Sequence, residues 1–399
     1  MERTRVWADT TGPDTGTPGE EVDLSAVALN SYTEWDPLRE VVVGSLSGGV
    51  FPSWQESMAH TLPESAWQHS KEEGGLPFPA AHLKAAEEEL DTLAEVLEAE
   101  GVRVVRPDAV NHARPFRTPH WESEGGLYAG MPRDHLMVVG DAVIEAPMSW
   151  RCRYHEGDAF RTLLKSWFRR GARWMPAPRP QLTDELYQTP GGTAAPDGER
   201  WAVTEFEPVF DTADFLRFGQ DIVVQRSHVT NEFGIDWVRR ALGPEFTVSV
   251  IETDDPHAMH IDATLAPLAP GKLLVNPERY VPHEMFDGWE ILPAPTPALP
   301  SDWPMYFCSP WVSMNVLSLD PETVVVERQE QPLIDALTAW GFRCVPVDFR
   351  HVYSFGGSFH CVTLDTVREG GSAKYLGPGR SSTRWTEETA SRLAGGGLA

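Results

Sequence analysis

The sequence predicts an α/β fold built from five repeated units. A strand-rich segment, an amphipathic helix, a glycine and a further strand follow one another five times along the 399 residues. A unit this short cannot bury its apolar face alone, so repeats of this kind are typical of closed rings. An ordinary α/β sheet with five crossovers is the alternative, but two strands ahead of each helix favour small, separate mixed sheets. We therefore expect a closed ring of five ββαβ units with pseudo-fivefold symmetry.

The strands ahead of the helices are expected where β-branched residues gather. In chain order these segments read REVVVGS, HLMVVGDAVIEAP, DIVVQRS, KLLVNP, and VLSL with TVVVE. Apolar runs of four to eight residues bounded by turn-forming residues are typical of buried strands.

The helices follow these strands, and each is expected to end at a glycine. In residues 81–100, Leu83, Leu90, Leu93 and Leu97 form one apolar stripe with helical spacing. A glycine adopts the left-handed conformation that ends many helices without steric cost. The other helices are predicted at 159–170, 233–242, 278–287 (which contains Pro282) and 332–340, and the glycines are Gly101, Gly171, Gly243, Gly288 and Gly341.

Composition divides the chain into one folded domain and two tails. Residues 1–25 are rich in Thr, Gly, Pro, Asp and Glu and are expected to form a disordered arm. Residues 26–376 are expected to form a single catalytic domain, and 377–399 a flexible tail.

The net charge and the cysteine spacing restrict the cellular compartment and the classes of binding partner that we expect for this protein. Acidic residues outnumber basic ones 59 to 33, and this excess argues against nucleic acid and anionic membrane surfaces as partners. The sequence has no apolar run of membrane-spanning length and no signal-peptide core. Four widely spaced cysteines are typical of reduced thiols, so we expect a cytoplasmic protein.

A cysteine in the last inter-unit loop is the first candidate for chemistry. Gly356 and Gly357 precede Cys361, and a thiolate beside a base is an effective nucleophile. His360 is the sequence neighbour, but adjacent side chains on an extended strand point to opposite faces. We therefore expect His260 to be the base and Asp211 to orient it. The alternative is that Cys361 is simply a small buried hydrophobic residue, as is expected for Cys152, Cys308 and Cys344.

The acidic loops around these residues allow two kinds of ligand. His257 and His260, with Asp255 and Asp262 nearby, could hold zinc, but no second His or Cys pair at ligand spacing supports a metal. Carboxylates without a metal favour a cationic substrate, and two of them can hold a planar guanidinium. Asp134 and Asp262 are suited to this. Arg279 could hold a substrate carboxylate or could equally be a surface arginine.

Eight motifs in order resemble the arginine:glycine amidinotransferase family, which includes the inosamine-phosphate amidinotransferases. They are EWDPLREVVVG, MPRDHLMVVG, IEAPMSWRCRY, EPVFDTADFLRFGQDI, MHIDAT, NPERY, SMNVL and GGSFHC. The resemblance covers about residues 34–375. It implies the five-module propeller of the pentein superfamily, no metal or organic cofactor, and a homodimer. It implies transfer of an amidino group from L-arginine to an acceptor amine.

The resemblance also implies roles for single residues. It makes Cys361 the nucleophile, His260 the general acid and base, and Asp211 its carboxylate partner. The substrate-binding positions that it implies are Asp134 and Asp262 for the guanidinium, Arg279 for the amino-acid carboxylate, and Ser309 with the preceding Cys308.

Departures from the family pattern surround the acceptor side of the predicted site. Cys308 stands where the glycine enzymes have a serine, Ser358 replaces a glycine, and His257 replaces an asparagine. These changes, with the segment 189–200 expected to form a flexible loop, indicate an acceptor other than glycine, either a longer amino acid or another amine of a specialised biosynthetic pathway. Two rival functions remain, an arginine deiminase-like hydrolase of the same fold and a non-catalytic propeller that binds a guanidino compound.

Overall fold

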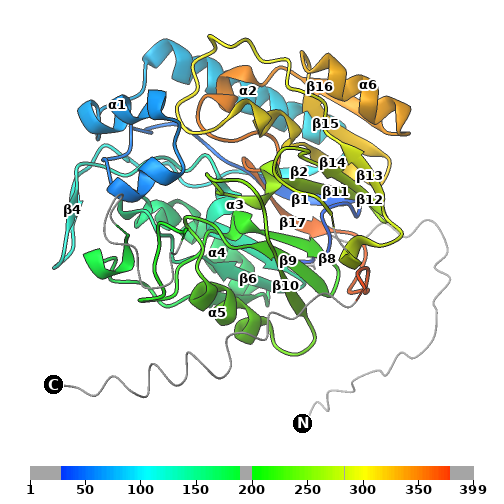
Figure 1. Cartoon of the computed structure of the whole chain (residues 1–399), viewed down its shortest axis with the longest axis horizontal. Coiled ribbons are helices and arrows are strands. Elements are labelled where there is room, and N and C mark those ends of the chain that lie inside the picture. The colour runs from blue at the N-terminus through cyan, green and yellow to red at the C-terminus, as the bar shows by residue number, and fades with distance from the viewer. Residues whose placement is uncertain (1–27, 189–199, 283, 378–399) are drawn as a thin grey trace.

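The computed structural model describes residues 28–188, 200–282 and 284–377 (Figure 1). The predicted arm, nearly all of the predicted tail and nearly all of segment 189–200 lie outside these residues. Among the described residues, no helix combines the length and apolar character needed to cross a bilayer.

Four units of the chain form three-stranded sheets with one topology. In each sheet the first two strands pair antiparallel as a hairpin, and the third joins the second in parallel after a crossover. The strands are β5 (Leu136–Val139), β6 (Ala142–Glu145) and β7 (Arg173–Pro176); β8 (Phe215–Phe218), β9 (Asp221–Gln225) and β10 (Thr247–Ile251); β11 (Leu265–Ala269), β12 (Lys272–Val275) and β13 (Glu290–Pro293); β14 (Leu317–Asp320), β15 (Thr323–Glu327) and β16 (Arg343–Val347).

The remaining sheet joins the two ends of the folded chain. β1 (Leu38–Val43) pairs in parallel with β2 (Arg103–Val105) and antiparallel with β17 (Thr363–Arg368). The strand that completes the first unit therefore comes from the far end of the sequence. Successive sheets are in contact, for example through β17 with β5 and β11 with β14, and β1 with β14 brings the fifth sheet against the first. Five repeated sheets are thus observed, while exact fivefold symmetry stays a prediction.

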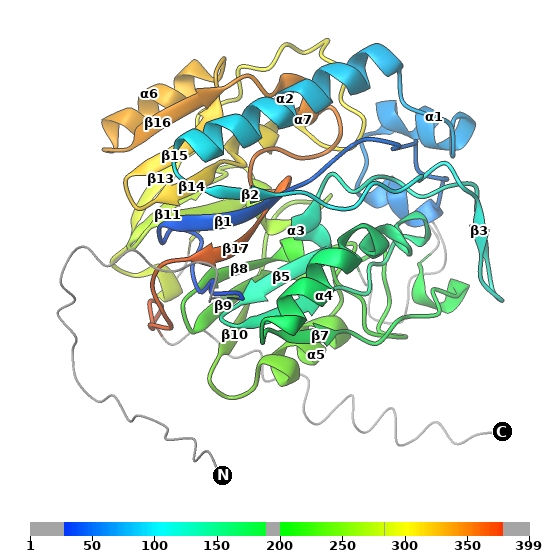
Figure 2. The same cartoon turned by 180° about the vertical axis from the view of Figure 1, so that it is seen from behind.

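Helices cover the outside of the sheets (Figures 1 and 2). α2 (Ala80–Ala99) and α6 (Gln331–Ala339) lie along one side of the molecule, and α4 (Arg161–Arg169) and α5 (Glu232–Leu242) lie along the opposite side. Leu90, Leu93 and Leu97 of α2 are fully buried, as the apolar stripe predicts. Each of the five glycines that were expected to follow a helix has a positive φ.

The expected helix at 278–287 is wrong. Only the short 3-10 turn η7 (Glu284–Phe286) forms there. Pro282 lacks the backbone N–H that an α-helix needs, and its ring would clash with the preceding turn.

Insertions and short turns fill the space between the repeated elements. η1 (Glu56–His60) and α1 (Glu64–Glu72) lie between β1 and α2, and the small hairpin of β3 (Phe116–Arg117) and β4 (Glu122–Ser123) follows β2. The single-turn elements are α3 (Pro132–His135), α7 (Arg350–Tyr353), η2 (Arg151–Arg153), η3 (Glu156–Phe160), η4 (Asp184–Leu186), η5 (Thr212–Asp214), η6 (Ile261–Ala263) and η8 (Pro310–Met314).

One apolar cluster connects this scaffold to the expected catalytic loop. The buried leucines of α2 belong to the same cluster as Phe355, Phe359 and Cys361, which lie between α7 and β17. Because close-packed interiors resist displacement, the backbone around Cys361 is held by the body of the protein.

Candidate active site

The first strand of every sheet is preceded by a single turn, and these turns supply the candidate site. α3 precedes β5, η5 precedes β8, η6 precedes β11, η8 precedes β14, and the turn at 359–362 precedes β17. Asp134, Asp211, Asp262, Ser309 and Cys361 lie in these turns or at their first position. The repeat therefore brings residues that are far apart in sequence to equivalent places.

A cavity of about 220 Å³ collects most of the expected site residues. Asp211 is the exception, because it lies behind His260 and does not line the cavity. The expected residues that line it are Asp134, His260, Asp262, Arg279, Cys308, Ser309 and Cys361.

Cys361 is buried at the base of this cavity. Its backbone N–H donates to Asn315 Oδ1 at 3.0 Å, and its Sγ donates to Asp262 Oδ2 at 3.2 Å. Burial, followed by the negative charges of Asp262 and Asp134, raises the pKa of the Cys361 thiol well above its ordinary value. The cysteine of the free protein is therefore a thiol at neutral pH.

His260 lies between two carboxylates. Its Nε2 is 3.1 Å from Asp211 Oδ2, and its Nδ1 is 3.6 Å from Asp134 Oδ1. Burial opposes the charged ring, but Asp134, Asp211 and Asp214 outweigh it and raise the pKa of His260 to about 10. His260 has a φ of 61°, a strained value for a residue with a side chain, and such strain occurs most often at functional sites.

Arg153 is a residue that the sequence analysis did not single out. Its guanidinium contacts Asp134 at 2.9 Å, Asp211 at 3.3 Å and Glu156 at 2.7 Å, and it is almost fully buried. It holds together the two carboxylates that flank His260. Arg153 is part of the motif IEAPMSWRCRY, but nothing in its local pattern distinguishes it from a surface arginine.

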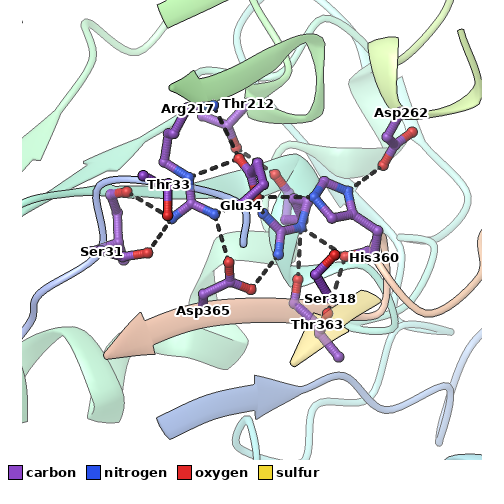
Figure 3. A network of polar contacts seen from close by, with 12 residues as sticks. Ser31, Thr33, Glu34, Thr212, Arg217, Asp262, Ser318, His360, Thr363 and Asp365 are labelled. Atoms are coloured by element: carbon purple, nitrogen blue, oxygen red, sulfur yellow. Dashed lines mark hydrogen bonds and ion pairs between the residues drawn. The ribbon is translucent and has the colours of Figure 1, made fainter. Parts of the chain in front are cut away.

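His360 and Cys361 do not lie on an extended strand, so the reason given above for excluding His360 as the base is wrong. Residues 359–362 form a turn rather than an extended strand, so adjacent side chains need not diverge. His360 Nδ1 lies 2.8 Å from Asp262 Oδ2, the same oxygen that Cys361 contacts. Its Nε2 lies 3.2 Å from Glu34 Oε2 (Figure 3). His360 does not line the cavity, and both ring nitrogens are occupied by carboxylates.

Arg279 is part of the cavity wall rather than a surface arginine. One guanidinium nitrogen donates to Ser309 Oγ at 3.0 Å, and another lies 3.1 Å from Asp255 Oδ2. Cys308 was expected to be buried like Cys152, but it is only partly buried and lines the cavity. Burial raises the pKa of the Cys308 thiol to about 12, so it is a neutral neighbour of the site.

The residues proposed for a zinc site do not come together. Asp255 contacts Arg279, and His257 lies with its Nδ1 2.8 Å from the carbonyl of His60. Within the described part of the chain, Asp134, His260 and Cys361 are the group whose possible metal-ligating atoms all lie within 4.8 Å of one another. These three side chains also place a carboxylate and an imidazole next to a thiol.

Comparisons with known proteins decide the family. No family model matches the chain. The L-arginine:L-lysine amidinotransferase of Pseudomonas savastanoi pv. phaseolicola is 48% identical over 353 residues, 87% of this chain and 96% of the relative. The chain belongs to the amidinotransferase family. Mitochondrial glycine amidinotransferase of Xenopus laevis is 42% identical over 87% of this chain and 84% of the relative.

A solved amidinotransferase has the same fold. SxtG of Microseira wollei, from the saxitoxin biosynthetic pathway, superposes with a TM-score of 0.81 at 44% identity, over 87% of this chain and 99% of SxtG. The expected family and the expected α/β fold class are therefore confirmed, and the protein is an enzyme of the amidino-transferring class.

Proposed function

We propose that this amidinotransferase moves the amidino group of L-arginine through a covalent intermediate on Cys361 to an acceptor amine, with release of ornithine. The observation that supports this is the meeting of Cys361, His260 and Asp134 within 4.8 Å at the base of one cavity. A thiol, an acid–base group and a carboxylate for the cationic carbon are the groups that the transfer needs.

Recognition of arginine is assigned to the walls of the cavity. Asp134 and Asp262 hold the planar guanidinium on either side of the thiol, and Arg279 binds the amino-acid carboxylate at the other end, beside Ser309 and Cys308. Asp255 and Ser309 already fix the guanidinium of Arg279, so its orientation is set before substrate arrives.

The first half-reaction forms the intermediate. The Cys361 thiol releases its proton to solvent, because His260 is already protonated, and the thiolate attacks the guanidino carbon to form a tetrahedral adduct. His260, whose pKa near 10 keeps it protonated, donates a proton to the departing nitrogen. The carbon–nitrogen bond breaks, ornithine leaves, and an amidino-thioether remains on Cys361.

The second half-reaction reverses these steps with a new amine. The acceptor nitrogen attacks the amidino carbon, His260 takes its proton, and the carbon–sulfur bond breaks to regenerate the cysteine. Asp211 and Arg153 keep the imidazole in place throughout. Ping-pong kinetics follow, since ornithine leaves before the acceptor reacts.

Mass spectrometry of the intact protein after incubation with arginine alone tests the proposal. We expect ornithine release in a single burst and one added amidino group, located on Cys361. Cys361→Ala should give neither, while Cys344→Ala should retain both because Cys344 lies outside the cavity. Continuous release of citrulline and ammonia would instead indicate a deiminase-like hydrolase, and no adduct with tight arginine binding would indicate a non-catalytic binder.

We further propose that glycine is not the preferred acceptor. Cys308 and His257 both line the cavity, so two of the three departures from the glycine-enzyme pattern lie at the site itself. A relative at 48% identity is named for transfer to lysine, which supports a longer amino acid. An inosamine phosphate fits less well, because the carboxylates that line the cavity would repel the phosphate group of this acceptor.

Competition between equal concentrations of glycine, lysine, longer ω-amino acids and an aminocyclitol phosphate measures this preference directly. A clear preference for glycine would contradict it. The homodimer, the cytoplasmic location and the absence of nucleic-acid or membrane partners also remain predictions, and light scattering of the purified protein tests the first of them.

A further inference from the structure

A chain of buried polar contacts leads from Cys361 away from the cavity into the core. Cys361 Sγ meets Asp262 Oδ2, His360 Nδ1 meets the same oxygen at 2.8 Å, and His360 Nε2 meets Glu34 Oε2 at 3.2 Å. Figure 3 shows the His360 ring between the two carboxylates. The mechanism above uses Asp262 and Cys361 but gives His360 and Glu34 no task.

These groups are shielded from water. Asp262 is 2% exposed, Glu34 is 4% exposed and His360 is 7% exposed. Buried polar groups must find their partners within the protein, and losing one leaves the other with the cost of its desolvation. Each ring nitrogen of His360 faces a carboxylate oxygen, so both polar atoms of the ring have a partner within the protein.

The far end of the chain of contacts is fixed by two arginines. Arg217 donates to both carboxylate oxygens of Glu34, at 2.8 and 2.6 Å, and Arg133 lies 3.3 Å from Oε2. Both arginines also bind Asp365 of β17, and Figure 3 shows the contact of Arg217. Arg133 donates in addition to the backbone carbonyl of His360 at 2.7 Å. Glu34 is therefore a rigid anchor, and both the ring and the backbone of His360 are held.

Because Glu34 holds His360 in place, His360 in turn restricts the orientation of the Asp262 carboxylate. The side-chain contacts of Asp262 within the described residues both fall on Oδ2, one from His360 and one from Cys361. Rotation of the carboxylate about its last bond would exchange its two oxygens. The hydrogen bond from His360 opposes this rotation and leaves Oδ1 for a donor in the cavity that Asp262 lines.

We propose that His360, anchored by Glu34, is a positioning residue that fixes the Asp262 carboxylate so that one oxygen faces the Cys361 thiol and the other binds the guanidinium of the substrate. This inference rests on the proposed function, since it assigns Asp262 to guanidinium binding. His360 itself does not touch the substrate, and its role is exerted through Asp262.

Two amide substitutions at position 360 separate the two contacts. The amide nitrogen of asparagine lies as many bonds from Cβ as Nδ1 does, so His360→Asn can keep the contact with Asp262 and loses Glu34. The amide nitrogen of glutamine corresponds in the same way to Nε2, so His360→Gln can keep Glu34 and loses Asp262. The readout is the dissociation constant of arginine, measured by calorimetry in a Cys361→Ala background where no reaction occurs.

We expect His360→Gln to raise the dissociation constant by about tenfold or more, the effect of losing a charge-assisted hydrogen bond. His360→Asn should raise it by no more than about threefold, because the bond that orients Asp262 is kept. With Cys361 restored, His360→Gln should still release a full burst of ornithine at saturating arginine. His351→Gln is the matched control, since His351 also contacts a carboxylate, Glu89 at 2.6 Å, but does not line the cavity.

Equal weakening by both amides would show that His360 merely fills space, and unchanged binding in both would show that it has no role; either result overturns the inference. Glu34→Gln is a second, independent variant. It should weaken binding modestly in the wild-type background and have no further effect once His360→Asn has removed the contact; an additive effect would contradict the anchor. Wild-type protein that releases no ornithine would contradict the proposed function, whereas active wild-type protein with unaffected variants would contradict only the role of His360.

Discussion

The Asp262 carboxylate serves two purposes that oppose each other. In the proposed function it attracts the guanidinium of the substrate, yet its charge lies 3.2 Å from the sulfur that would have to become a thiolate. Burial and the charges of Asp262 and Asp134 together raise the pKa of Cys361, so the free protein carries an unreactive thiol. If Asp134 and Asp262 bind the guanidinium as proposed, the cation neutralises these carboxylates, and activation of the nucleophile is then linked to its arrival.

Removing that charge should separate the two purposes. In Asp262→Asn the pKa of Cys361 should fall, because a neutral amide no longer opposes the thiolate. Each unit of that fall raises the thiolate fraction roughly tenfold, so alkylation of Cys361 by iodoacetamide at pH 8 should be faster by about that factor. Binding of arginine should weaken at the same time. Slower alkylation in the variant would contradict the electrostatic account, and Asp211→Asn, which lacks direct contact with the sulfur, is the control.

At the scale of elements, the site depends on a turn placed before each first strand. The loop from α7 to β17 shows how closely such a turn is packed. A Cβ added at Gly357 would lie 2.5 Å from Met131 Sδ and 2.7 Å from the Cβ of Cys361, so the loop has room only for glycine. Cys361 therefore cannot keep its place if this residue acquires a side chain.

Gly357→Ala should accordingly disturb catalysis more than folding. We expect kcat/KM to fall by about 100-fold, the order of effect that a displacement near 1 Å produces. Gly371→Ala is the matched control, because an added Cβ there has nothing within 4 Å and should leave kinetics and melting temperature unchanged. Wild-type kinetics in Gly357→Ala would show that the loop tolerates the shift.

The sequence predicts the elements well where local pattern decides them, and poorly where distant residues do. The stripe of Leu90, Leu93 and Leu97 defines a helix without help from the rest of the chain. The pairing of β1 with β17 joins residues about 330 positions apart, and no local pattern reveals it. Cys361, His260 and Asp134 could be identified because each lies in a recognisable local motif. The contacts of Arg153 and His360 join residues that are distant in sequence, so only the folded structure reveals them.

At the scale of the whole molecule, a strongly acidic chain surrounds a buried interior in which charges are matched. Arg133, Arg217 and Arg368 contact Asp365 at 2.5 to 2.8 Å in the core, and all four are almost fully buried. Buried charges of this kind are tolerated only when they are paired, and breaking a pair is strongly destabilising. Folding and protonation of these carboxylates are therefore coupled.

Two buried glutamates should show this coupling with opposite signs. Burial tends to raise the pKa of Glu156, but Arg153 and His135 outweigh it and lower the pKa to about 2. Its contribution to stability is present above the unfolded value near 4.5 and is lost as pH falls through about 2. Burial raises the pKa of Glu327 to about 7, so its ionisation costs stability as pH rises from about 4.5 through 7.

Urea unfolding of the glutamine variants from pH 3 to pH 8 measures both effects. Glu156→Gln should lower the free energy of unfolding at pH 7 by on the order of 3 kcal/mol, and this deficit should shrink below pH 4 as the carboxylate of the unfolded wild-type chain takes up a proton. Glu327→Gln should gain stability relative to wild type between pH 5 and pH 8, because the amide cannot ionise. The two slopes must have opposite signs, because Arg153 contacts Glu156 at 2.7 Å and outweighs its burial, whereas Arg350 lies 3.8 Å from Glu327 and does not. Parallel slopes would mean that net charge, rather than local pairing, governs how this protein responds to acid.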